Sequence, residues 1–217
     1  MRKPIVLAAL AAAALTFAGI ASAHVTIHPN ALPSGGYTVI NVRVPNERAT
    51  TTTTKVAVSF PSGFYSVSYK PVPGWSAKVL YRKLAQPLTM NGESVTQEVD
   101  QVVFSGKLAP HQFTEFPLSV AVPSVKTGTV LTFKALQTYS NGEIVRWIGP
   151  PGADTPAPQV VVTSANSPVQ DYPGGVAAIK KARTTASALT PERGLVFGLP
   201  LVGLLGAGAV TRRRRPS

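Results

Sequence analysis

The feature that most constrains the fold is a recurrence of short apolar runs across residues 24–162, spaced about ten to fifteen residues apart. Runs such as "YTVINVRV", "FTEFPLSVAV" and "TVLTFKALQTYS" are separated by Pro, Gly and Asn, and none has a convincing helical period. Asn91-Gly92 and Asn141-Gly142 are typical of two-residue hairpin turns. Such spacing indicates a sandwich or a barrel, and we expect an all-β domain built as an antiparallel β-sandwich.

The N-terminal residues 1–23 predict a cleaved secretory signal peptide. Two basic residues precede an apolar segment (residues 4–20), and the "ASA" that follows supplies the small residues that signal peptidase requires. An uncleaved N-terminal anchor is the alternative. With cleavage after Ala23, the mature chain begins at His24, with a free α-amine beside an imidazole.

An uncharged segment at residues 194–210 predicts a transmembrane helix. It is near the shortest length that crosses a bilayer, and Arg212 to Arg215 follow it, as in a stop-transfer signal that stays cytoplasmic. A sorting signal that is clipped off and a buried core helix are the alternatives. We expect a single-pass protein of the cell membrane, with its domain outside and a basic tail (residues 211–217) in the cytoplasm.

Composition divides the remainder into a domain at residues 24–163 and a linker at residues 164–193, where Pro, Gly, Ala, Ser and Thr dominate. The chain has no cysteine, which excludes a disulfide framework and a thiolate metal site. The formal charge of +12 becomes +6 without the signal peptide and the tail, since 15 Lys and Arg then oppose nine Asp and Glu. This modest excess suits anionic lipid or cell wall and gives no indication of nucleic-acid binding.

A histidine at the first position offers a metal two nitrogens from one residue. The α-amine and Nδ1 of His24 close a six-membered chelate ring, and both lose their protons at modest cost near neutral pH. Nitrogen ligands in a tetragonal arrangement favour Cu(II). The plain alternative is a frayed terminal residue without metal. We expect His28 to be structural, because an extended chain holds the two imidazoles about 13 Å apart, and His111 to be a turn or surface residue.

Two further side chains are candidates for the same site. Glu115 is the carboxylate inside the strongly apolar run "FTEFPLSVAV", opposite the core face. A carboxylate among phenylalanines needs a cationic partner, which is either a metal ion or a basic side chain. Trp147 ends a strand just before a Pro-Pro sequence, where an indole packs in the core or covers a cation.

The "HVTIHP" start, the "FTEF" strand, the "SNGEIVRW" hairpin and the C-terminal span resemble the YcnI-like copper-binding family over nearly the whole chain. The resemblance implies a cupredoxin-like or immunoglobulin-like sandwich that binds Cu(II) through a monohistidine brace. Carried over, the site residues are His24, Glu115 and Trp147, with Glu115 preferred to Glu143 on motif context alone. The resemblance also implies a role in copper uptake or homeostasis, with a CopD-like membrane copper importer as partner.

The expected function is therefore that of a membrane-tethered Cu(II)-binding protein, a copper chaperone or delivery module and not an enzyme. One alternative is a copper-dependent oxidative enzyme of the histidine-brace type, as in polysaccharide monooxygenases, which add a second histidine. The other is a wall-associated β-domain without metal. No nucleophile elbow in the sequence indicates a hydrolase.

Overall fold

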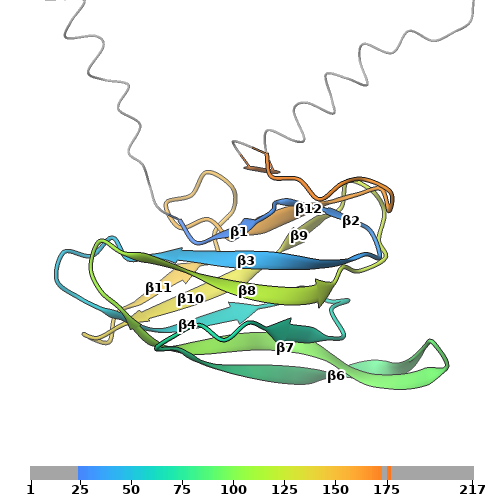
Figure 1. The fold of residues 1–217 in the computed structure, drawn as a ribbon, viewed down its shortest axis with the longest axis horizontal. Helices are drawn as coiled ribbons and strands as arrows, with labels where there is room; N and C mark the ends of the chain where they lie inside the picture. Colours follow the sequence, from blue (N-terminus) through green and yellow to red (C-terminus); the bar gives the residue numbers. More distant parts are fainter. Residues whose placement is uncertain (1–23, 173–174, 177–217) are drawn as a thin grey trace, which may run out of the picture.

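The computed structural model describes residues 24–172 and 175–176, and β-strands dominate them (Figure 1). The predicted signal peptide, the transmembrane helix at 194–210 and the tail at 211–217 lie outside the described residues, as does most of the predicted linker. In the described part of the chain, no helix has the length and apolar character that a membrane span requires. The strands are β1 (Thr26–His28), β2 (Ala31–Pro33), β3 (Tyr37–Pro45), β4 (Thr53–Ser59), β5 (Val67–Tyr69), β6 (Ser76–Met90), β7 (Glu93–Leu108), β8 (Phe113–Ala121), β9 (Val130–Thr132), β10 (Lys134–Tyr139), β11 (Ile144–Trp147) and β12 (Gln159–Thr163).

Two antiparallel sheets enclose the main apolar core (Figure 1). One has the order β1-β3-β8-β5, and the other has the order β11-β10-β4-β7-β6. A small third sheet, β2-β12-β9, contains a parallel pair, because β12 runs alongside β2. The expected all-β class with antiparallel sheets is confirmed. The parallel β2–β12 pair was not expected, because the period of a strand does not reveal the direction of its neighbour.

The two-residue period of the strands decides which side chains fill the core. On β8, Phe116, Leu118 and Val120 are buried, which confirms the core face expected from the sequence. Phe116 stacks on Phe104 of β7, with ring centroids 3.9 Å apart, so the ring contact joins the two sheets. Burial of a side chain of this size stabilises the fold by about 1.5–3 kcal/mol.

The two Asn-Gly pairs form different turns. Asn91 and Gly92 have positive φ angles of 51° and 83° and join β6 to β7 directly, as expected for a two-residue turn. The second pair lies in a four-residue connection between β10 and β11, so the expectation of a two-residue turn is wrong there. Only Gly142 of that pair has positive φ (85°), and Asn141 Oδ1 accepts a hydrogen bond from the Glu143 N–H at 3.1 Å, which closes the longer loop.

After β12 the chain returns to its own first strands. The buried Asn30 side chain donates to the Tyr172 carbonyl at 3.0 Å and accepts from the Tyr172 N–H at 2.9 Å. Ala31 and Gln170 form an antiparallel bridge. The first residues of the predicted linker therefore pack on the domain beside β1 and β2, and both ends of the described chain lie on the same side of the sandwich (Figure 1).

Candidate metal centre

His24 is held at one edge of the sandwich by the strand that follows it. Val25 and Ile27 are buried, and β1 pairs with β3, with Thr26 opposite Arg43. Burial of these two apolar side chains fixes the direction in which the chain enters the sheet. The imidazole is therefore positioned by packing, and His24 is half-buried.

Trp147 approaches His24 from the other sheet. It lies on β11 and is 6% exposed, and its ring centroid is 5.7 Å from that of His24 in an edge-to-face arrangement. The structure thus brings together two of the three site residues expected from the sequence. At this distance the indole screens one side of the imidazole from water.

Gln137, a fully buried polar residue on β10, sets the orientation of the indole. Trp147 Nε1 donates to Gln137 Oε1 at 3.0 Å. The Gln137 amide donates in turn to the Pro45 carbonyl at 2.7 Å and to Thr53 Oγ1 at 2.8 Å. Strands β3, β4, β10 and β11 are thereby linked behind the indole. The sequence reasoning missed Gln137, although a glutamine at an inward position of "KALQTY" was a usable signal.

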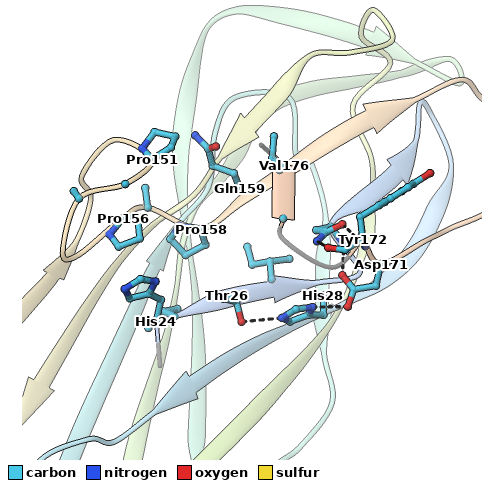
Figure 2. Close-up of a pocket in the computed structure, with 17 residues that line it drawn as sticks. His24, Thr26, His28, Pro151, Pro156, Pro158, Gln159, Asp171, Tyr172 and Val176 are labelled. Carbon is cyan, nitrogen blue, oxygen red and sulfur yellow. Dashed lines mark hydrogen bonds and ion pairs between the residues drawn. The ribbon is translucent and has the colours of Figure 1, made fainter. Parts of the chain in front are cut away.

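Two cavities open beside His24. The first, of about 520 Å³, lies between β1, the proline-rich loop around Pro151 and Pro156, and the last described residues, including Val176 (Figure 2). The second, of about 570 Å³, is bordered by His24, Glu47 and other polar residues. The second cavity offers more metal-ligating side chains than the first.

Glu115 lies on the outer face of β8, opposite Arg43 of β3, and is exposed. It lines neither of the two cavities beside His24. Two strand spacings and two residues along the strand separate it from His24, which corresponds to roughly 12 Å between Cα atoms. Arg43 stands between them and covers the Phe113 ring at 4.0 Å. The structure does not bring Glu115 into contact with the other two expected site residues.

Two carboxylates share a cavity with His24: Asp171 lines the first cavity, where it is bonded to His28, and Glu47 lines the second. Glu47 follows the end of β3, and the pairing of β3 with β1 directs this end toward His24. The sequence reasoning missed Glu47. An acidic residue just beyond the end of a strand was visible in the sequence. It indicates a site near His24 only if one also knows that this strand pairs with the N-terminal strand.

Glu143, the other carboxylate considered from the sequence, forms an ion pair with Arg48. The guanidinium of Arg48 also lies 5.3 Å from the Tyr139 ring. Glu143 lines neither cavity beside His24. Its ion pair connects the β10–β11 turn to the segment between β3 and β4.

The two other histidines differ in their contacts. His28 uses both ring nitrogens within the protein, with Nδ1 at 2.7 Å from Asp171 Oδ2 and Nε2 at 2.9 Å from Thr26 Oγ1 (Figure 2). These bonds agree with a structural role. His111 is exposed and lines the second cavity, as Glu47 does.

Among the described residues, no three His, Cys, Asp or Glu side chains form a group that could hold a metal ion. A monohistidine brace needs fewer side chains, because its first residue supplies two nitrogens.

The fold and this edge define a β-sandwich in which a histidine at the start of the domain packs on a buried tryptophan. The chain belongs to the family described as a domain of unknown function, DUF1775, whose model matches residues 24–162. Over 207 residues it is 28% identical to the copper-binding protein CutI of Bacillus subtilis strain 168, covering 95% of this chain and 94% of that protein. It is 30% identical to a solved structure of an uncharacterized protein from Nocardia farcinica with an immunoglobulin-like fold, at a TM-score of 0.50, covering 65% of this chain and 99% of that one.

These matches confirm the resemblance to the YcnI-like family that the sequence indicated. They also agree with an immunoglobulin-like form of the sandwich. CutI is named as a copper-binding protein, in agreement with the expectation of a binding protein.

Proposed function

We propose that this protein binds Cu(II) outside the cytoplasm through His24 and passes the ion on, as a copper chaperone or delivery module tethered to the membrane. The contact between His24 and the buried Trp147 carries the proposal. The family match begins at residue 24, the residue that the predicted cleavage makes first. The match to a protein named for copper binding covers nearly all of both chains.

The ligand set follows from the side chains around the first residue. Once cleavage frees it, His24 chelates through its α-amine and Nδ1. Glu47 is the carboxylate that we assign as the oxygen donor, because it lines the cavity that has more metal-ligating side chains beside His24. Glu115, expected from the sequence, has to reach past β3 to donate an oxygen. Nitrogen and carboxylate donors suit Cu(II), whereas Cu(I) prefers the sulfur donors that this site lacks.

Trp147 favours delivery over oxidative chemistry. A buried indole against the histidine would cover one side of a bound metal ion and limit the access of oxygen, whereas an oxidase needs an open position. The predicted span at residues 194–210 would keep the domain at the membrane, where a CopD-like importer is the recipient that the family resemblance implies.

Two matched substitutions test the ligand set. Glu47→Gln is expected to weaken Cu(II) binding by about tenfold or more, equivalent to ~1.4 kcal/mol, because it removes a ligand charge and keeps the shape. Glu115→Gln makes the same chemical change on the outer face of β8 and is expected to leave affinity unchanged. Competition titrations with EPR measure both. If only Glu115→Gln lost affinity for Cu(II), Glu115 would be the carboxylate ligand, as expected from the sequence. If neither variant lost affinity, neither Glu47 nor Glu115 would be a ligand.

Tryptophan emission tests where the metal sits. Cu(II) is a paramagnetic quencher, so binding beside Trp147 should reduce emission, and Trp147→Phe should remove most of this response. Trp75→Phe is the control, because Trp75 packs against Phe116, with ring centroids 4.9 Å apart, in the core away from His24. Quenching that follows Trp75 would contradict the placement.

Peroxide production separates delivery from catalysis. The copper-loaded protein with ascorbate should release little peroxide, and Trp147→Ala should release more, because it removes the cover over the metal. Strong turnover of a polysaccharide by the unaltered protein would instead favour the oxidative enzyme.

A further inference from the structure

The outer face of the sheet β11-β10-β4-β7-β6 carries a group of cations. Lys55 points outward from β4, and Lys134 on β10 pairs with Ser59 of the same strand face. Lys78 on β6 and Arg146 on β11 occupy the two ends of one row across the sheet. Cross-strand partners present their side chains on the same face, so the four cations share one surface, and all four are exposed.

The row between Arg146 and Lys78 shows what separates the charges. Three apolar side chains lie between these two cations, one on each intervening strand. In order across the sheet the row is Arg146, Leu136, Ala57, Val103 and Lys78. The rows on either side of it add Ser, Thr, Gln, Leu and Ile. In these three rows the face therefore has a half-buried apolar centre, cations around it and no carboxylate, and Arg82 with its partner Glu98 follows beyond the bulge between β6 and β7.

None of the four cations is neutralised by an ion pair in the described part of the chain. Among the acidic residues on or next to these strands, Glu143 pairs with Arg48, and Glu98 and Asp100 share the single guanidinium of Arg82. The remaining ion pair joins His28 to Asp171. The positive charge of the face is thus available to an external anion.

The spacing of the charges indicates the kind of anion. Four strand spacings put Lys78 and Arg146 about 19 Å apart, and Lys55 and Lys134 are about 14 Å apart. A single small anion can contact the diagonal neighbours Lys134 and Arg146, about 8 Å apart, but it cannot reach all four cations, whereas a linear polymer with repeated charges can.

Three observations favour a polyanion over a bilayer or a protein. The positions in these rows carry no aromatic side chain, the kind that anchors proteins at a membrane interface, and the described chain ends beside β1 and β2, away from this face (Figure 1). Three of the four cations are lysines, which protein–protein interfaces disfavour but which bind phosphate readily as point charges.

We propose that this sheet face binds a linear polyanion with repeated phosphate groups outside the membrane. On β11, Arg146 points to this face while Trp147 points into the core beside His24. The two sites are therefore on opposite sides of the strand, and occupation of the polyanion face requires no copper.

Binding of a fluorescently labelled linear inorganic polyphosphate to the full-length chain in non-ionic detergent tests the proposal. One variant carries Lys55→Gln, Lys78→Gln and Lys134→Gln. Its control carries the same change at three exposed lysines off the rows, Lys70, Lys83 and Lys126, so both variants lose the same net charge. The face variant should bind roughly tenfold or more weakly at moderate salt, and the slope of log K against log salt should fall by about 2, whereas the control should keep most of its affinity.

Three results would overturn the proposal. Equal losses in both variants would show that only net charge matters. If the unaltered chain did not bind polyphosphate, the proposal that this face binds a polyanion would be wrong. Hydrogen-exchange protection of this face by phosphatidylglycerol nanodiscs, without protection by polyphosphate, would assign the face to a bilayer. Cu(II) affinity should be unchanged in both variants, so failure of this proposal and failure of the copper proposal are distinguishable.

Discussion

Replacement of Gln137 by leucine tests whether a buried hydrogen-bond network positions the indole beside His24. Gln137 is fully buried and bonds to Trp147 Nε1, the Pro45 carbonyl and Thr53 Oγ1. Gln137→Leu keeps a side chain of similar size but leaves these three polar groups without that partner. At about 1–3 kcal/mol for each group, the gross cost is roughly 3–9 kcal/mol.

The net cost is smaller than this sum. Thr53 Oγ1 loses an incoming donor but keeps its own O–H for donation, and the added apolar surface of leucine returns about 1–2 kcal/mol. We therefore expect Gln137→Leu to lower the free energy of unfolding by about 2–5 kcal/mol. Urea unfolding of the metal-free protein, followed by circular dichroism, measures the change.

A matched control is available on the outer face of the sandwich. Gln101 donates to Ser59 Oγ at 3.0 Å in a partly buried position, where water can replace the bond. Gln101→Leu should therefore change the free energy of unfolding by less than about 0.5 kcal/mol. Equal effects of Gln137→Leu and Gln101→Leu would refute the reasoning. In the double variant Gln137→Leu with Trp147→Phe the losses should be less than additive, by about 1–2 kcal/mol, because both partners of one bond are gone.

Two further predictions concern stability and local order. Burial alone would raise the pKa of the Glu98 carboxyl, but the Gly63 N–H and Arg82 outweigh it and lower this pKa. The carboxylate thus contributes stability that is full above its ordinary pKa of about 4.3 and is lost as the pH falls through the lower folded value. Glu98→Gln should destabilise the protein by about 1–2 kcal/mol at neutral pH and hardly at all in strong acid; a gap in urea midpoints that persists there would contradict this. Asn30→Ala removes both bonds to the Tyr172 backbone, so the Tyr172 amide should exchange hydrogen faster while the core strands do not change; unaltered exchange at Tyr172 would show that other contacts hold the segment.

Sequence reasoning succeeded where one strand by itself holds the information. The inward face of β8 follows from the alternation around Phe116, and the β6–β7 turn follows from the positive φ angles that Asn91 and Gly92 tolerate. Both depend only on residues adjacent in the chain. The β10–β11 turn shows the limit, because a four-residue loop, in which Asn141 Oδ1 accepts from the Glu143 N–H, replaces the expected two-residue turn.

The candidate site was predicted only in part, because it is assembled across strands. His24 and Trp147 were expected together, and the structure places them in contact. Glu47 reaches the same cavity only through the register of β1 with β3, and no period in the sequence reveals that register. The partners of Gln137 likewise come from other strands, so its place behind the indole could not be predicted from "KALQTY" alone.

The most direct test of the copper proposal compares two proteins that differ by one residue at the start. One begins at His24, and the other has a single alanine before it, which keeps the imidazole and moves the α-amine off the six-membered chelate ring. Competition titration with Cu(II) should show at least about a hundredfold weaker binding by the extended protein, equivalent to ~2.7 kcal/mol, with the fold intact by circular dichroism. Equal affinity of the two proteins would contradict the copper site at the first residue.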